Sequence, residues 1–419
     1  MERPLIAGWQ CRVCGASVDI ATPFTWKCPS ATDVDRHHAM RLVQGAASLV
    51  SSGQSNPFVA FRPHLAWDAF VAAHGLTAPA REAMVYELDS QVASVAGTGF
   101  VATCCERADE LSDALGFGAE GGVWVKDETR NVAGSHKARH LFTILLHLRA
   151  AEQLGLARWT QRPPLAIASC GNAALAAATL AAAVSWPIQV FVPPSANFHV
   201  TKRLAALGAT VVECPRLTSD PAGDPCVHRF RETVAEGAIP FSVQGTENAW
   251  CLDGGRTLGW ELAELEFERL FVQVGGGAFA ASVSEGIAMG GSAPKLHAVQ
   301  TQAAAPLARA WERSRAQSPA DHWSECMWPW ENVGESAADG ILDDETYDWL
   351  PVVEAMEFSD GSPVVVTEAH VLEANELGRR TTGTDVSHTG TAGLAGLLAI
   401  RDQVSPDERV AVIFSGVRR

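Results

Sequence analysis

The sequence has little positive charge and no apolar run long enough to cross a membrane. Its 419 residues carry 32 Lys and Arg against 48 Asp and Glu, a formal net charge of −16. Such a surface repels phosphate backbones and anionic membranes, so we expect neither nucleic acid nor a membrane as a partner. The most apolar stretch, 173–184, is alanine-rich and shorter than a membrane span, and it predicts a buried helix instead.

Two further absences concern location. The first ten residues lack the apolar segment of a signal peptide. Ten cysteines are spread along the chain without the spacing of a small disulfide-bonded domain. Both absences predict a protein of the reducing cytoplasm.

The length allows two or three domains with buried cores. From residue 123 onward, short β-rich runs alternate with helical patterns such as 141–154 and 173–184. Several runs are apolar almost throughout, which is typical of parallel strands covered on both faces. The predicted strands are 123–125, 165–168, 188–192, 210–212, 270–274, 296–299 and 410–414. The fold class is therefore α/β with parallel sheets, and functional residues are expected at the carboxyl ends of strands.

Three other regions have their own texture. Residues 1–40 hold several cysteines and histidines but little helical or strand periodicity. The stretch 63–96 has helical spacing, broken near His74-Gly75. The region 311–360 is rich in Trp, Pro, Ser and acidic residues, and we expect it to be irregular.

The first motif that carries chemistry is Gly134-Ser135-His136-Lys137, which follows a predicted strand and opens a helix. Gly134 can adopt a positive φ, and Ser135 is a suitable N-cap. A lysine in the first helical turn opposes the helix dipole, unless its nitrogen is neutralised in a Schiff base. Taken alone, Lys137 also fits a surface lysine at a helix start.

The second motif is Ser169-Cys170-Gly171-Asn172, between a predicted strand and the alanine-rich helix. Backbone N–H groups at a helix start can bind an anion such as a carboxylate. Asn172 adds a neutral donor that could face a phenolate oxygen. A plain strand–turn–helix corner capped by Asn172 explains the same residues.

The third motif is Gly275-Gly276-Gly277-Ala278-Phe279, after another predicted strand. Three glycines let the backbone close around a phosphate at the start of the next helix. The spacing matches neither common nucleotide-binding fingerprint, which argues against a nucleotide site.

In the fourth motif, Ser415 ends the last predicted strand. Its hydroxyl could meet a ring nitrogen, or it could simply cap a helix.

Together the four motifs resemble fold-type II pyridoxal 5′-phosphate (PLP) enzymes, the family of threonine synthase, serine/threonine dehydratases and cysteine synthase. The resemblance spans roughly residues 98–416. It rests on the lysine motif 125–139, the turn 170–172, the loop 275–279, and the segment 248–261 that usually precedes that loop.

The resemblance implies a tryptophan synthase β-like fold with two open parallel-sheet domains. It assigns 41–150 with 250–419 to a large PLP domain, 151–249 to a small α/β domain, and 1–40 to a zinc-ribbon-like segment. It also implies a homodimer.

The resemblance further implies a role for each site residue. Lys137 binds PLP covalently and serves as the general base. The cofactor is also held by Asn172, Gly275, Gly276, Gly277, Ala278, Phe279 and Ser415. The substrate is bound by Ser169, Cys170, Gly171 and His136.

Some residues depart from the family pattern. His136 stands where the family usually has Phe, Cys170 stands where it has Ser or Thr, and Thr103-Cys104-Cys105 replaces a usual Thr-Pro-Leu. These departures bear on the substrate more than on the cofactor.

The N-terminal cysteines Cys11, Cys14 and Cys28 resemble the zinc ribbon with which threonine synthases often begin. That ribbon normally has four cysteines, so His38, or its neighbour His37, would complete a Cys₃His site for structural zinc. A ribbon that has lost its metal is the alternative.

The activity implied is that of a PLP-dependent lyase or synthase resembling threonine synthase. It would act on a small amino acid by β- or γ-elimination or replacement. A serine/threonine-type ammonia-lyase (dehydratase) is the nearest alternative, and racemisation on the same scaffold is also open. A protein of another class, which binds PLP or an amino acid without turnover, is a further alternative.

Overall fold

The computed structural model describes residues 5–32, 34–45 and 48–419, and these group into two compact units. One unit consists of 1–101 and 137–257, and the other of 102–136 and 258–419. The α/β class is confirmed, and all seven predicted strands are present. The three predicted domains remain a prediction.

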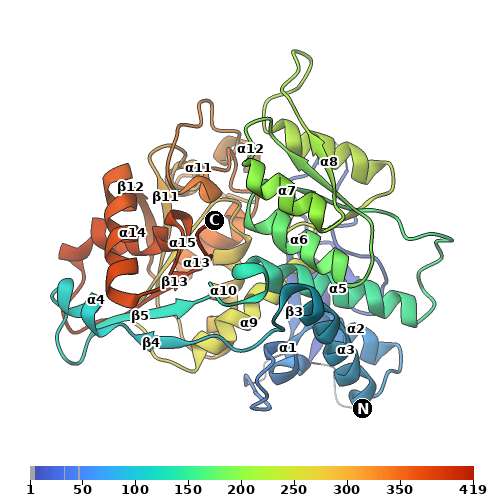
Figure 1. Ribbon diagram of the computed structural model, residues 1–419, viewed down its shortest axis with the longest axis horizontal. Helices are drawn as coiled ribbons and strands as arrows, with labels where there is room; N and C mark the ends of the chain where they lie inside the picture. Colours follow the sequence, from blue (N-terminus) through green and yellow to red (C-terminus); the bar gives the residue numbers. More distant parts are fainter. Residues whose placement is uncertain (1–4, 33, 46–47) are drawn as a thin grey trace. The chain divides into compact units, whose positions relative to one another are not determined.

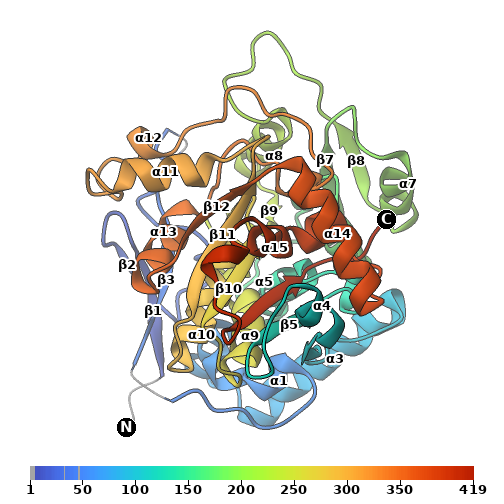
Figure 2. The same cartoon turned by 90° about the vertical axis from the view of Figure 1, so that its left-hand side faces the viewer.

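The second unit is built on a six-stranded sheet (Figure 2). Its neighbouring strands are parallel, except that β4 runs antiparallel to β5 at one edge. The strands, in sheet order, are β12 (Ser362–Val366), β11 (Lys295–Thr301), β10 (Arg269–Gln273), β13 (Arg409–Phe414), β5 (Gly122–Asp127) and β4 (Cys105–Arg107).

Helices α14 (Glu368–Thr382) and α15 (His388–Ala399), red in Figure 2, pack together, and α15 also lies on the central strands. Together they bury an aliphatic core. The remaining helices and 3₁₀ turns are α4 (Asp109–Ala114), η2 (Val132–Gly134), α10 (Ala278–Met289), α11 (Pro306–Ser314), α12 (Trp323–Cys326), η3 (Asp339–Ile341), α13 (Trp349–Phe358) and η4 (Arg401–Gln403). The region 311–360, which we expected to be irregular, thus contains α12, the 3₁₀ turn η3 and α13.

The first unit contains a four-stranded parallel sheet in the order β8 (Thr210–Glu213), β7 (Ile188–Val192), β6 (Leu165–Ala168), β9 (Ile239–Pro240). Helices α6, α7 and α8, green in Figure 1, accompany it. The unit's helices and 3₁₀ turn are α1 (Pro57–Ala60), η1 (Arg62–His64), α2 (Ala66–Ala73), α3 (Ala78–Ala96), α5 (Lys137–Gln153), α6 (Asn172–Ala183), α7 (Phe198–Ala206), α8 (Pro225–Ala235) and most of α9 (Cys251–Ala263). The predicted break near His74-Gly75 separates α2 from α3.

The N-terminal segment of this unit holds strands that the sequence did not predict. An antiparallel sheet forms in the order β2 (Ser17–Asp19), β1 (Ile6–Cys11), β3 (Met40–Gln44). Trp26, between β2 and β3, makes an edge-to-face contact with Trp250 at 5.5 Å, and its carbonyl accepts a 2.7 Å hydrogen bond from the Ala249 amide. The ring of Trp250 stacks in turn on His147 of α5 at 4.2 Å. The segment is therefore joined to α5 through an aromatic stack.

Helices α5 and α9 approach so closely that one glycine is required between them. A Cβ on Gly254 would lie 2.0 Å from the Arg139 carbonyl oxygen and 2.6 Å from the His140 Cα. Since both atoms are backbone, neither can move aside without shifting a helix.

We therefore predict that Gly254→Ala destabilises the protein, although alanine has the higher helix propensity by about 1 kcal/mol. Overpacking of a filled interior costs about 1–3 kcal/mol, and a backbone clash belongs at the upper end of that range. Thermal unfolding followed by circular dichroism would show a lower midpoint. An unchanged or raised midpoint would contradict the close approach.

Candidate active site and candidate metal centre

The predicted phosphate loop and Ser415 meet at one edge of the six-stranded sheet. Strands β10, β13 and β5 are neighbours and parallel, so their carboxyl ends share that edge. The glycine loop follows β10, Ser415 follows β13, and the segment that leads to His136 follows β5. The His136 amide donates a 3.1 Å hydrogen bond to the Ser415 carbonyl, which joins two of the three segments directly.

The glycine loop has the backbone that an anion site needs. Gly277 has a φ of +95° and caps α10 without any side-chain hydrogen bond to the helix start. A Cβ there would lie 2.9 Å from the Thr346 Cγ2, so only glycine fits. The amides at the start of α10 are thus available to a phosphate. At the other end of the loop, the Asp343 carboxylate lies against Gly275, so an anion belongs at the Gly277 end.

The His136 ring is held in this site by a ring stack and a hydrogen bond. Its ring stacks on Phe279 of the glycine loop with centroids 3.8 Å apart and an interplanar angle of 24°. Its Nδ1 lies 3.1 Å from the Ser415 carbonyl oxygen. Because a carbonyl only accepts, Nδ1 must carry a hydrogen. The histidine that replaces the family's usual Phe therefore still contributes a flat ring, and it adds a titratable group.

Ser415 is buried, with 4% of its surface exposed, and its partner is a residue that sequence reasoning missed. The side-chain amide of Gln273, the last residue of β10, donates to the Ser415 Oγ at 2.5 Å. The parallel pairing of β10 with β13 brings the carboxyl ends of the two strands together, and Gln273 and Ser415 lie there. Strand adjacency is a tertiary property, and no signal in the sequence marks it.

A buried polar network supports the segment before the lysine. Lys126 Nζ donates to the Glu261 carboxylate at 2.5 Å and to the Thr103 carbonyl at 2.6 Å. The Thr103 hydroxyl donates to Glu128, and the Asn131 amide donates to the same carboxyl group at 2.6 Å. Removing one partner would leave a buried group unpaired, so the network acts as a structural unit.

The other unit holds the predicted lysine and the predicted carboxylate turn. Lys137 begins α5 and is half-buried. In the turn, Gly171 caps α6 without a side-chain hydrogen bond, and its own amide lies 3.3 Å from the Ser169 Oγ. Cys170 is exposed and Asn172 is the first helical residue. The N-cap of α6 is thus a glycine without a capping side chain, and carboxylate binding by this turn stays a prediction.

Helices α5 and α6 pack against each other within this unit, so Lys137 and Asn172 begin neighbouring helices. The glycine loop, Ser415 and His136 likewise lie together in theirs. The meeting of these two groups around one cofactor, and the role of each residue in it, stay predictions.

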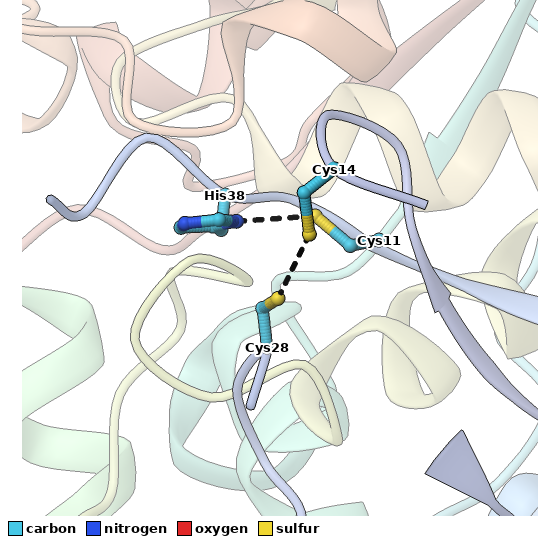
Figure 3. Close-up of side chains that lie close together, drawn as sticks. All are labelled: Cys11, Cys14, Cys28 and His38. Atoms are coloured by element: carbon cyan, nitrogen blue, oxygen red, sulfur yellow. Dashed lines mark hydrogen bonds between the residues drawn. The ribbon is translucent and has the colours of Figure 1, made fainter. Parts of the chain in front are cut away.

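The four predicted metal ligands come together in the N-terminal segment (Figure 3). One ligand atom from each of Cys11, Cys14, Cys28 and His38 lies within 4.8 Å of all the others. The Cys14 and Cys28 sulfurs are 3.5 Å apart, and the Cys11 sulfur is 3.4 Å from the His38 Nδ1. Tetrahedral zinc, with bonds of about 2.0–2.3 Å, places its ligand atoms roughly 3.5–3.8 Å apart. His38 rather than His37 belongs to this group.

Two details of the cluster also suit a cation. Desolvation raises the pKa of Cys14, but hydrogen bonds from the Ala16 amide, Cys28, Ser30 and Cys11 outweigh it and lower that pKa, while desolvation and the contacts with Cys14 and Cys11 raise the pKa of Cys28. The two thiols thus share one proton between them, and a cation would favour loss of that proton as well. A thiolate is the form that binds metal. The His38 Nδ1 faces the Cys11 sulfur, and its Nε2 lies 3.6 Å from an Asp35 carboxylate oxygen, which is an ion-pair distance too long for a hydrogen bond.

Comparison with known proteins decides the family. A family model described as pyridoxal-phosphate dependent enzyme matches residues 98–416. The chain belongs to this family. This PLP-enzyme family supports PLP as the cofactor, and the matched range agrees with the resemblance found in the sequence.

Solved structures of fold-type II PLP enzymes share the fold. The processed form of threonine deaminase isoform 2 from Solanum lycopersicum is 18% identical with a TM-score of 0.60, over 90% of this chain and 95% of that one. Maize serine racemase is 18% identical with a TM-score of 0.59, over 80% and 93%. The L-serine ammonia-lyase of the fungus Rhizomucor miehei is 19% identical with a TM-score of 0.58, over 76% and 94%. No curated protein sequence matches this PLP-enzyme chain.

In the part of the chain that the structure describes, every helix is too short or too polar to cross a membrane.

Proposed function

We propose that this PLP-dependent enzyme is a lyase or synthase that eliminates or replaces a group at Cβ or Cγ of a small amino acid. The observation that carries the proposal is the neutral residue at the carboxyl end of β13. Ser415 and its partner Gln273 are both uncharged and buried. A carboxylate there would favour a protonated ring nitrogen, whereas a hydroxyl favours an unprotonated one. Negative charge then stays near the substrate Cα, which favours loss of a leaving group over transamination.

PLP, when bound, withdraws electrons from the substrate Cα and makes its proton acidic. The chain contains few lysines, so few candidates exist for the residue that binds PLP covalently. The sequence has five lysines, of which Lys27 and Lys202 are exposed. Lys126 is held by Glu261 in the buried network, and Lys295 pairs with Asp360 at the surface. Lys137 is the half-buried lysine at a helix start, and we assign it both covalent attachment and removal of the Cα proton.

The remaining residues bind and orient. The helix start at 171–172 suits the substrate carboxylate, because its N-cap is a glycine whose missing side chain leaves room for an anion beside the first turn. The open start of α10 suits the cofactor phosphate for the same reason. His136, stacked on Phe279 of the glycine loop, offers a group that can hold or release a proton beside the cofactor phosphate.

An ammonia-lyase that releases ammonia from hydroxy amino acids is the second candidate. It is favoured by the structural likeness to threonine deaminase and L-serine ammonia-lyase. Racemisation is supported in the same way by the likeness to serine racemase. At these identities the likeness concerns the fold alone, so the reaction must be decided by assay.

The test is a turnover assay of the PLP-loaded protein on serine, threonine, 2,3-diaminopropionate and O-phosphohomoserine. Ammonia, 2-oxo acid, inorganic phosphate and the two enantiomers are measured for each substrate. We expect release of a β or γ substituent from at least one. Racemisation without release would refute the lyase, and binding without turnover would indicate a non-catalytic protein. Lys137→Ala serves as the inactive control.

We further propose that Cys11, Cys14, Cys28 and His38 bind a structural zinc ion. Three cysteines and one histidine are a ligand set that zinc prefers, and the two separations of 3.4 and 3.5 Å are close to those between the ligands of tetrahedral zinc. Four protein ligands leave no open position for a substrate, so the role would be to stabilise the N-terminal sheet and its contact with Trp250.

A further inference from the structure

Gln273 makes contacts that reach beyond its own strand. It is 4% exposed, and its Nε2 lies 3.1 Å from the Ile413 carbonyl oxygen, 3.2 Å from the Gly390 carbonyl oxygen and 2.5 Å from the Ser415 Oγ. Gly393 leaves room for this side chain, because a Cβ there would lie 3.1 Å from the Gln273 Oε1. One buried amide thus joins β10, β13 and the start of α15.

The orientation of this amide is decided by its neighbours. Carbonyl oxygens only accept hydrogen bonds, so the group that faces Ile413 and Gly390 must be the NH₂. A flipped amide would set its own oxygen against both of them. The observed orientation holds even though the Gln273 Oε1 is buried and has no hydrogen-bond partner within the described part of the chain.

This orientation determines what the Ser415 hydroxyl can do. An amide NH₂ cannot accept, so the Ser415 oxygen accepts from Gln273 and its hydrogen must point elsewhere. For that hydrogen the structure records no acceptor in residues 5–32, 34–45 and 48–419. A buried donor without an acceptor is unfavourable, so the hydroxyl is set up to donate to a ligand atom that carries a lone pair.

We propose that Gln273 is a positioning residue that makes Ser415 a hydrogen-bond donor to the ring nitrogen of PLP and thereby keeps that nitrogen unprotonated. The inference rests on the proposed function, in which Ser415 faces the ring. The inference goes beyond the proposed function, because a serine hydroxyl can either donate to an unprotonated ring nitrogen or accept from a protonated one. Ser415 alone therefore does not determine the direction of this hydrogen bond. If the hydroxyl accepted from both Gln273 and a protonated ring, its own hydrogen would stay buried without an acceptor among the described residues. Gln273 therefore favours the arrangement in which Ser415 donates to the ring nitrogen.

The test uses full-length protein loaded with PLP that is ¹⁵N-labelled in its ring. The ring ¹⁵N resonance is compared at pH 6–9 in the wild type, Gln273→Met, Ser415→Ala and the double variant. We expect Gln273→Met to move the resonance towards the protonated position, as a shift of about one pH unit in the nitrogen's titration would do. In the double variant the resonance should equal that of Ser415→Ala, since Gln273 acts only through Ser415.

Gln300→Met is the matched control. Gln300 is an equally buried glutamine on the adjacent strand β11, and it bonds Val274, Thr346, Leu307 and Ala308 but not Ser415. It should lower thermal stability and leave the ¹⁵N resonance at the wild-type position. PLP affinity, measured by absorbance titration, serves as a second readout and should weaken in Gln273→Met more than in the control.

The possible outcomes distinguish failure of the proposed role of Gln273 from failure of the proposed PLP-dependent function. A resonance that is the same in Gln273→Met and wild type, but moved in Ser415→Ala, would overturn the role of Gln273 alone. A resonance unaffected by Ser415→Ala would show that the serine does not face the ring. A spectrum of free PLP only would refute the proposed function itself.

Discussion

Replacing Lys137 by alanine is expected to abolish the visible absorbance band of protein-bound PLP and to reduce turnover by at least about 10³-fold. Loss of a general base alone costs typically 10²–10⁴-fold, and loss of covalent attachment adds to it. The side chain begins α5, whose body is almost wholly buried, so the helix itself should persist in the variant. Absorbance scans of protein reconstituted with PLP, together with turnover on the best substrate, measure both effects.

The matched control for this experiment is Lys295→Ala. Lys295 is a half-buried lysine, like Lys137, but its ion pair with Asp360 lies at the surface, and such pairs contribute little to stability. The control should keep the band and the activity. If Lys137→Ala retained the wild-type band, another lysine would hold the cofactor and the assignment would be wrong.

Removal of one metal ligand is expected to have the largest effect on stability. Cys28→Ser should lose the bound zinc and lower the free energy of unfolding by at least about 3 kcal/mol, since structural zinc contributes folding free energy directly. For a domain of this size that corresponds to a fall of roughly 6–12 °C in the unfolding midpoint. Metal analysis of the purified protein and scanning calorimetry provide the two measurements.

Cys104→Ser is the control, because Cys104 is an exposed cysteine outside the cluster. It should retain both the metal and the wild-type midpoint. The zinc assignment would fail if the wild type contained no stoichiometric metal, or if Cys28→Ser unfolded at the same temperature.

Because the N-terminal segment contacts α5, the Cys28→Ser variant is also expected to change the affinity for PLP. Trp26 bonds the Ala249 amide and packs on Trp250, which stacks on His147 of the helix that Lys137 begins. Loosening the N-terminal sheet should therefore raise the Kd for PLP in Cys28→Ser. Chelator treatment of the wild type should reproduce the change, and an unaltered Kd would show that the two sites are independent.

Much of this protein could be predicted because its signals are local. Apolar runs of three to five residues between helical patterns indicate the α/β class, since such runs are typical of buried parallel strands. The three loops with glycine, asparagine or lysine at helix starts depend on backbone geometry that neighbouring residues dictate. The Cys11-x-x-Cys14 spacing likewise determines that two ligands of the proposed metal site lie close together.

The strands of the N-terminal segment could not be predicted in this way. Its strands β1, β2 and β3 are short and carry no clear alternation, and their pairing joins Ile6–Cys11 to Met40–Gln44 across a long stretch of chain. Helix α13 was missed for a related reason: Trp349–Phe358 follows an acidic, proline-containing stretch whose composition hid its start.

By itself the sequence determined the class of the fold, the family and the residue types that the site offers, because these follow from periodicity and from motifs within a few residues. Only the tertiary structure decided which of two histidines joins the three cysteines, and which buried amide reaches Ser415. The reason is that such partners are set by the order of strands in a sheet and by the path of the chain between them. Gln273 lies 142 residues from Ser415 in sequence and 2.5 Å from it in space.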